Sequence, residues 1–304
     1  MDRRTFLSTA ATLAAATAAR TRAAVAPNLA WAGEVGLTTS SIFRQMTPGR
    51  ADRHVGWLDL PKVMRDELGM RVLDFNSGSF ASLEPGQLDK FRAALDAAGC
   101  VVSNVKVNTT VLGVKVQDLS IESPDRAVRE AALTRYRDWI TAAHHVGARW
   151  VRPFPADVRP DLPLLAEGLG RLADMADGRH MAVLLENAGW MAADADAIPR
   201  VVAAVGGRVG AQPDTGSWES PALREAGLRK AFPFAVSCDF KVGRLGPNGV
   251  HAAYDLKRCF DLGWQAGFRG PWVIEHAGEN TRELFRELLW IRDQLKAWIS
   301  AAGR

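Results

Sequence analysis

The feature that most limits how this chain can fold is a repeated alternation of short apolar runs and helix-like segments. Eight such runs predict strands, and several of the helix-like segments end at a glycine, as at Gly99 and Gly147. The predicted strands cover 34–39, 71–76, 101–108, 149–153, 181–186, 208–214, 234–241 and 271–275. The predicted helices cover 60–68, 85–98, 123–146, 161–177, 195–205, 221–231, 254–266 and 281–301.

Strands that alternate with helices are expected to pair in parallel, because parallel strands need crossover connections. Eight units over about 270 residues suit a (β/α)₈ TIM barrel. A doubly wound open sheet is the main alternative, but it usually carries a glycine-rich phosphate loop after an early strand, and this sequence has none. No segment is long or polar enough to divide the chain. We therefore expect one α/β TIM barrel over residues 25–304.

Residues 1–24 have the pattern of an export signal. A charged start is followed by an alanine-rich stretch and then by small residues. Arg3 and Arg4, followed by Phe6 and Leu7, resemble a twin-arginine (Tat) signal peptide. The alternative is an ordinary amphipathic first helix, but the stretch lacks a polar face with helical period. This resemblance predicts a periplasmic or secreted protein.

The formal net charge of +4 belongs mostly to that leader. Arg3, Arg4, Arg20 and Arg22 against Asp2 account for +3, so the rest of the chain is nearly neutral. A neutral barrel argues against a nucleic-acid partner. No apolar run is long enough to suggest a membrane helix, and three cysteines are too few for a disulfide framework. Whether the chain forms a homo-oligomer stays open.

A carboxylate lies at the end of four successive predicted strands: Glu186, Asp214, Asp239 and Glu275. The carboxyl ends of barrel strands meet at one face, where such acids repel one another unless a cation is present. Oxygen ligands favour a hard divalent ion, so we expect one metal ion, Mn²⁺ or Mg²⁺. The alternative is purely structural, with the acids paired to Arg152, Lys241 and Arg244.

Three short motifs resemble a known superfamily. Leu-Leu-Glu-Asn at 184–187, Asp-Thr-Gly at 214–216 and Ile-Glu at 274–275 are similar to the signature of xylose isomerase-like sugar isomerases and epimerases. The motifs arrive on the expected strands in the expected order. The resemblance implies one divalent metal held by Glu, Asp, His and Glu, with Glu186, Asp214 and Glu275 in the first, second and fourth places.

The third place departs from that pattern. The superfamily usually has His-x-Lys on this strand, whereas this chain has Asp239 and Lys241 around Phe240. Strand alternation places Asp239 and Lys241 on one face, so we expect Asp239 to face the metal. The same alternation turns His276 away from Glu275, which favours a packing or supporting role for His276.

The resemblance also implies a reaction. A metal holds two oxygens of a sugar and polarises its carbonyl, and Glu186 and Glu275 act as the base and acid pair. We therefore predict a metal-dependent sugar isomerase or epimerase that forms an enediolate from a free or oxidised sugar. A 3-keto-glycoside lyase would begin with the same proton abstraction. An exported sugar-binding barrel without catalysis is the non-enzymatic alternative, and the superfamily's multi-zinc endonucleases need more histidines at the strand ends.

Further polar or aromatic residues near the predicted strand ends are candidates for contacts with the sugar. Each could instead be a solvated loop group, a core residue or part of an ion pair. The candidate substrate-binding residues are Lys106, Asn108, Arg152, Trp218, Lys241 and His251.

Overall fold

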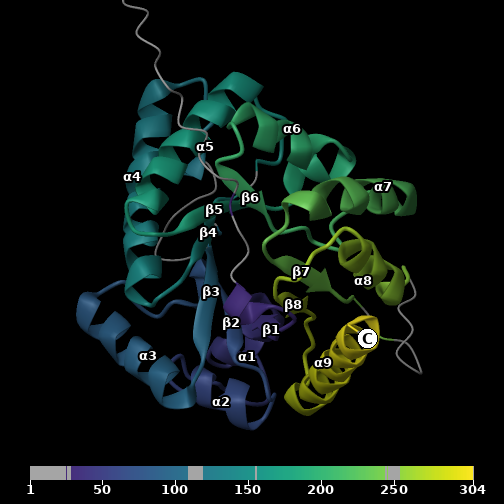
Figure 1. Cartoon of the computed structure of the whole chain (residues 1–304). Helices are drawn as coiled ribbons and strands as arrows, with labels where there is room; N and C mark the ends of the chain where they lie inside the picture. The colour runs from purple at the N-terminus through teal and green to yellow at the C-terminus, as the bar shows by residue number, and fades with distance from the viewer. Residues whose placement is uncertain are drawn as a thin grey trace, which may run out of the picture.

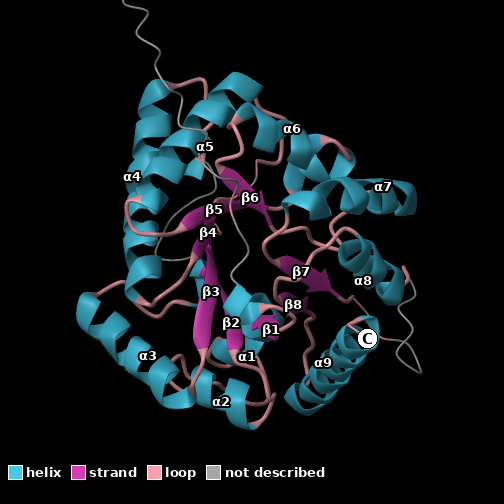
Figure 2. Ribbon diagram, viewed as in Figure 1, coloured by secondary structure: helices cyan, strands magenta, loops and turns pink. Residues whose placement is uncertain are grey.

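The structure is a computed structural model that describes residues 25, 29–108, 119–154, 156–243, 245 and 254–303. The predicted leader and His251 lie outside these residues. Eight parallel strands form one curled sheet surrounded by helices, which is the predicted (β/α)₈ TIM barrel (Figures 1 and 2). Within the described part of the chain, no helix has the length and apolar character needed to span a membrane.

The strands pair in the order β6-β5-β4-β3-β2-β1-β8-β7. Two isolated parallel bridges, Ala211 with Ala235 and Asp214 with Asp239, join the edges of this sheet and close the barrel. The strands are β1 (Val35–Thr38), β2 (Val72–Asn76), β3 (Val101–Lys106), β4 (Trp150–Arg152), β5 (Ala182–Leu185), β6 (Val209–Ala211), β7 (Cys238–Lys241) and β8 (Trp272–Glu275).

The helices lie outside the strands (Figure 2). The α-helices are α1 (Phe43–Met46), α2 (Leu60–Asp66), α3 (Pro85–Ala98), α4 (Arg126–His145), α5 (Leu162–Asp177), α6 (Ala197–Ala204), α7 (Pro221–Ala231), α8 (Leu256–Gln265) and α9 (Thr281–Ala302). Short 3₁₀ helices are η1 (Leu29–Trp31), η2 (Thr39–Ile42), η3 (Ser77–Ser79), η5 (Gly189–Ala193) and η6 (Phe232–Phe234).

Local sequence explains where many helices begin and end. The side chains of Asp125, Asp161 and Asp255 accept hydrogen bonds from the first turns of α4, α5 and α8. Each cap satisfies a backbone N–H that has no partner within its helix. Gly99 ends α3 with a φ of 65°, a conformation that costs glycine little.

The strands observed are shorter than those predicted from sequence. β3 ends at Lys106 rather than at residue 108, and β6 covers only Val209–Ala211 of the predicted 208–214. The difference arises at the mouth of the barrel, where polar strand ends leave the ladder to bond with side chains. Asp214, for example, donates its backbone N–H to the side-chain oxygen of Asn187.

The barrel interior changes from apolar to polar along its axis. Val72, Trp150 and Leu184 pack with Trp31 and Val236 in one interior cluster, whereas the intervening strand residues face the helices. The ring centroids of Trp31 and Trp150 are 5.2 Å apart in an edge-on contact. Because strand side chains alternate, the residues two positions further along β2, β4 and β5 also point inward. Those residues are Asp74, Arg152 and Glu186.

Candidate active site

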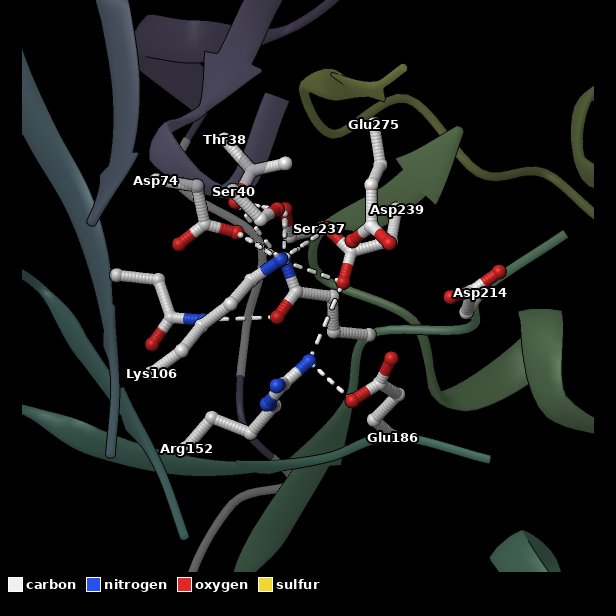
Figure 3. Close-up of polar contacts among 12 residues, drawn as sticks. Thr38, Ser40, Asp74, Lys106, Arg152, Glu186, Asp214, Ser237, Asp239 and Glu275 are labelled. Atoms are coloured by element: carbon white, nitrogen blue, oxygen red, sulfur yellow. Dashed lines mark hydrogen bonds and ion pairs between the residues drawn. The ribbon is translucent and has the colours of Figure 1, made fainter. Parts of the chain in front are cut away.

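Eight charged residues meet beyond the apolar interior cluster, at the carboxyl ends of seven strands. Figure 3 labels all of them except Lys241. All eight are buried or half-buried, so their charges interact through a poorly solvated interior. They are Asp74, Lys106, Arg152, Glu186, Asp214, Asp239, Lys241 and Glu275.

Lys106 lies at the centre of this group. Its Nζ is 2.6 Å from each carboxylate oxygen of Asp239 and 3.4 Å from Oδ2 of Asp74. Nζ also donates to the hydroxyl of Thr38 at 3.3 Å. Burial lowers the pKa of Lys106, but Asp239 and Asp74 outweigh that effect and leave the pKa above its ordinary value. Lys106 is therefore a charged ammonium whose described partners are protein groups rather than solvent.

Arg152 connects two of the predicted metal ligands. Its guanidinium forms an ion pair with Glu186, and its Nη1 lies 3.2 Å from Oδ2 of Asp239. The Nε atom of Arg152 is buried without a hydrogen-bond partner among the described residues. An unpaired donor in this position is costly unless a ligand or water accepts its hydrogen bond.

Lys241 connects the other two acids. Its Nζ is 2.6 Å from Oε1 of Glu275 and 3.1 Å from Oδ2 of Asp214. Burial alone would lower the pKa of Lys241, but the two carboxylates raise it above its ordinary value. Glu275 thus lies beside Lys241 and reaches the other acids through that ammonium.

Asp214 is held more rigidly than the other acids. Its carboxylate accepts hydrogen bonds from the backbone N–H of Gly216 at 2.6 Å and of Ser217 at 3.0 Å. The hydroxyl of Ser217 donates to it as well, at 2.7 Å. Burial raises the pKa of Asp214, but Lys241 and these donors lower it by more than burial raises it, so the net shift is downward. Asp214 is an ionised carboxylate with a fixed orientation.

Three of the four predicted metal ligands lie together. Glu186, Asp214 and Asp239 are all buried, and each offers an oxygen within 4.8 Å of the other two. Burial raises the pKa of Glu186 and of Asp239, against the opposing effects of Arg152 and Lys106. Glu275 is the predicted ligand outside this set, because it pairs with Lys241.

The donor set and its charge fit a divalent cation. All three donors are carboxylates, which suit hard ions such as Mg²⁺ and Mn²⁺. The five carboxylates of the site outnumber its three cations by two, and a divalent ion would balance that excess. Arg152 and Lys241 do form ion pairs with the acids, as the structural alternative expected, whereas Arg244 lies outside the described residues.

The predicted substrate contacts fall into different places. Asn108 donates to the side-chain oxygen of Asn76 at the rim, and its backbone N–H donates to Ser77. Trp218 is buried, and its ring packs on Gly227. Its indole N–H donates a hydrogen bond of 3.0 Å to the backbone carbonyl of Asp214. The structure therefore places Trp218 behind the loop that carries Asp214. Lys106, Arg152 and Lys241 lie in the charged cluster described above.

Several residues of the site were not among the predicted ones. Gln212 donates to Asp74 and, at 3.2 Å, to Asp239, while Asn104 donates to Gln212 at 2.7 Å. The side chain of Asn187 forms two hydrogen bonds with the backbone of Asp214. It donates to the carbonyl at 3.0 Å and accepts from the N–H at 2.8 Å. The available signal was a polar residue inside an apolar strand, and at Asp74 alternation from Val72 placed it on the inner face. Asn104 lies opposite Asp74 because the register between β2 and β3 skips Ser103, which alternation alone does not predict.

The His276 ring points away from the charged cluster and contacts neighbouring residues instead. This is the packing or supporting role that its position after Glu275 predicted. The ring nitrogens lie 3.2 Å from the carbonyl of Val242 and 2.6 Å from a carboxylate oxygen of Glu287. Its backbone N–H donates to Ser41, whose hydroxyl donates to the carbonyl of Ile274. These bonds join the ends of β7 and β8, which carry Lys241 and Glu275.

Solved structures with the same fold include proteins that act on sugars. The chain is similar to a xylose isomerase-like TIM barrel protein from Mycobacterium smegmatis in complex with magnesium, with a TM-score of 0.62, 17% identity and coverage of 90% of this chain and 97% of that one. It is also similar to D-psicose 3-epimerase from Clostridium cellulolyticum H10 with D-tagatose, with a TM-score of 0.64, 12% identity and coverage of 89% and 98%.

A third similar structure is 3-keto-D-glucoside 4-epimerase from E. coli in its apo form, with a TM-score of 0.63, 14% identity and coverage of 86% of this chain and 99% of that one. Identities this low establish the fold alone.

No curated protein matches this sequence. The family model described as xylose isomerase-like TIM barrel matches residues 66–294. Because this match spans most of the chain, the protein belongs to the xylose isomerase-like TIM barrel family.

Proposed function

We propose that this protein is a metal-dependent sugar isomerase or epimerase that moves a proton next to a carbonyl through an enediolate. The observation that carries the proposal is the buried set of Glu186, Asp214 and Asp239, whose oxygens converge at the carboxyl ends of β5 to β7. Active sites of TIM barrels lie at this end of the strands. Similar structures that act on sugars, including D-psicose 3-epimerase, support the same substrate class.

Glu186, Asp214 and Asp239 would hold the ion, with Glu275 joining them if its carboxylate leaves Lys241. The bound ion would polarise the sugar carbonyl and stabilise negative charge on its oxygen. Asp214 is already oriented by Gly216 and Ser217. Lys106 and Gln212 both donate hydrogen bonds to the carboxylate of Asp239 and so fix its position.

Glu186 would act as the base that removes the proton next to the carbonyl. Burial raises its pKa, which makes the carboxylate a stronger base, and Arg152 keeps it ionised and oriented. Glu275 pairs with Lys241 as a carboxylate, so it would first take up a proton from solvent and then return it to the enediolate, while Lys241 orients the group. Delivery to the opposite face of the same carbon yields an epimer, and delivery to the neighbouring carbon yields an isomer.

The test is solvent exchange. The protein is loaded with Mg²⁺ for proton NMR and incubated in D₂O with free ketoses and 3-keto-glycosides. Deuterium should enter next to the carbonyl of at least one sugar. Glu186→Gln should slow that exchange by about 10² to 10⁴-fold if it is the base, while the exposed Glu84→Gln should not.

The product distinguishes the related reactions. An epimer or isomer supports the proposal, whereas loss of the aglycone with formation of a double bond shows a 3-keto-glycoside lyase. Sugar binding by calorimetry without deuterium entry for any substrate would overturn the catalytic proposal and identify a sugar-binding barrel.

The compartment is a further part of the proposal. We propose that the twin-arginine leader exports the chain, so that its substrate is an unphosphorylated sugar found outside the cytoplasm. The support is the Arg3-Arg4 pair before Phe6 and Leu7 and the apolar stretch behind it.

A further inference from the structure

The turn that carries Asp214 and the strand end that carries Lys241 are joined by hydrogen bonds through Thr215. The hydroxyl of Thr215 donates to the carbonyl of Lys241 at 3.2 Å and accepts from the N–H of Lys241 at 2.9 Å. The N–H of Thr215 donates to the carbonyl of Asp239 at 3.0 Å. The backbone of Lys241 is therefore fixed relative to Asp214, one of the two carboxylates beside its ammonium.

The side chain of Lys241 crosses the same turn at Gly216. A Cβ atom at Gly216 would lie 2.6 Å from Cδ of Lys241 and 2.9 Å from the hydroxyl oxygen of Tyr254. The stem of Lys241 and the hydroxyl of Tyr254 thus share the space that glycine leaves open. Beyond this point, the ammonium of Lys241 pairs with Asp214 and Glu275.

Tyr254 binds the backbone of Lys241 from the segment that leads into α8. It is half-buried and lies two residues before that helix. Its hydroxyl donates to the carbonyl of Lys241, which also accepts from Thr215. Burial raises the pKa of Tyr254, so the hydroxyl keeps its proton and acts as a donor at neutral pH. Two segments of the chain therefore hold the same carbonyl.

Arg224 on α7 holds the ring of Tyr254. Its guanidinium carbon lies 4.0 Å from the centroid of that ring, and its Nε donates to the carbonyl of Thr215 at 3.0 Å. Arg224 is buried, and a cation–π contact strengthens where water is excluded. Among the described residues no carboxylate pairs with Arg224, so its partners there are the ring and the carbonyl.

These contacts link the outer helices to the charged site. The helices α7 and α8 lie side by side (Figure 1), and they bring Arg224 next to Tyr254. Tyr254 binds the backbone of Lys241, whose Nζ is 2.6 Å from Oε1 of Glu275. A small displacement of a group that delivers a proton lowers its rate strongly, because the transfer needs a close and aligned approach.

We propose that Tyr254 is a positioning residue for proton delivery, which fixes Lys241 and through it the carboxyl group of Glu275, while Arg224 holds the Tyr254 ring. This inference rests on the proposed function, in which Glu186 removes one proton and Glu275 delivers another. Loss of the Tyr254 hydroxyl should affect delivery more than removal, because Arg152 rather than Lys241 pairs with Glu186.

The experiment compares the two tyrosines of the chain. Tyr254→Phe removes the hydroxyl and keeps the ring beside Arg224. Tyr136→Phe is the matched control, because that hydroxyl also bonds to the main chain, at 2.9 Å from the N–H of Phe154, and does not bind Lys241. Each Mg²⁺-loaded protein is incubated in D₂O with a sugar that the parent converts. Proton NMR then measures product and the deuterium in recovered substrate.

The ratio of product to deuterated substrate isolates the delivery step. When Glu275 delivers slowly, the enediolate more often takes a deuteron back from Glu186 and returns to substrate. Tyr254→Phe should therefore lower the ratio by about fivefold, as expected for one lost hydrogen bond, and Arg224→Met should lower it as well. Tyr136→Phe should leave it unchanged, because a smaller folded fraction reduces both signals equally.

The outcomes separate this inference from the proposed function. A parent-like ratio in Tyr254→Phe would overturn the positioning role and leave the reaction intact. If the parent exchanges no sugar, the proposed function fails, and the placement of Lys241 is measured without substrate by NMR of ¹⁵N-labelled lysine. The signal that Lys241→Met removes is the Lys241 ammonium. It should shift and exchange faster with water in Tyr254→Phe but not in Tyr136→Phe, and an unchanged signal in Tyr254→Phe would overturn the inference.

Discussion

The ammonium of Lys106 lies 2.6 Å from both carboxylate oxygens of Asp239, and neither residue is exposed to solvent. Asp239 is the residue that the sequence resemblance sets against the histidine of the superfamily signature. Lys106 offsets the negative charge of Asp239 from β3, on the far side of the barrel interior (Figure 3). Asp239 is therefore both a member of the candidate metal set and the counter-ion of a buried lysine.

Replacing Lys106 should destabilise the fold strongly. Lys106→Met would leave Asp239 and Asp74 buried beside one another without their ammonium partner, which costs about 3–5 kcal/mol when one member of a buried pair is removed. Urea unfolding followed by circular dichroism measures the change. The exposed Lys90→Met is the matched control. A loss below about 1 kcal/mol would show that the pair contributes little.

A divalent ion should stabilise the protein independently of any activity. Mn²⁺ or Mg²⁺ bound among Glu186, Asp214 and Asp239 would relieve the repulsion of the two excess negative charges. At a hundredfold excess over its dissociation constant, the ion adds about 2.7 kcal/mol of stability, which appears as a higher Tm. Chelation should reverse that shift.

The ligand assignment is tested by titration calorimetry with Mn²⁺. Asp214→Asn should weaken binding by at least about tenfold, whereas the exposed Asp138→Asn should leave it unchanged. A parent protein that binds no ion at saturating Mn²⁺ would contradict the assignment of the three acids as ligands.

His276 should contribute to stability through its two side-chain contacts. His276→Ala would leave the Val242 carbonyl and the Glu287 carboxylate without this partner, at a cost of about 2–3 kcal/mol. Thermal and urea unfolding measure the loss, and the exposed His54→Ala should cost little. Equal stabilities of the two variants would show that His276 does not tie β7 to β8.

The cysteines should be unreactive in the folded protein. Burial raises the pKa of Cys100 to about 11 and that of Cys259 to about 12, and it raises the pKa of Cys238 as well. The thiolate is the reactive form, so an aromatic disulfide reagent at pH 8 should label these thiols only after denaturation. Rapid labelling without denaturant would contradict their burial.

The same thiols make stability depend on pH. An unfolded cysteine ionises near about pH 8.5, whereas the buried ones stay protonated, so the folded state binds more protons above that pH. Their contribution is complete below about pH 8.5 and is lost as the pH rises toward the folded values. The urea concentration at the midpoint of unfolding should therefore decrease as the pH is raised from about 7.5 to about 9.5. The decrease should be smaller in Cys259→Ala.

The leader can be tested by export of a fused reporter. Replacing Arg3 and Arg4 together by lysine should keep the reporter in the cytoplasm of a bacterial host with a twin-arginine pathway. Replacing Arg20 and Arg22 by lysine is the matched control and should allow export. Cell fractionation and immunoblotting give the distribution, and export of the Arg3 and Arg4 variant would contradict this route.

The sequence by itself determined the barrel and the position of its acids. Strand and helix periodicity are local properties, and eight repeats of them left few other folds. A carboxylate placed two residues after an inward-facing strand position, as Glu186 follows Leu184, points inward because side chains alternate. That local rule also placed Asp239 and Lys241 on the inner face.

Only the tertiary structure decided which acidic side chain pairs with which basic side chain. Lys106 and Asp239 are 133 residues apart, and their contact depends on how the closed sheet brings β3 and β7 across its interior. The same closure paired Arg152 with Glu186, left Glu275 with Lys241, and turned Trp218 into the core behind Asp214. Strand alternation specifies the side to which a residue points, whereas the curvature and stagger of the barrel determine its partner.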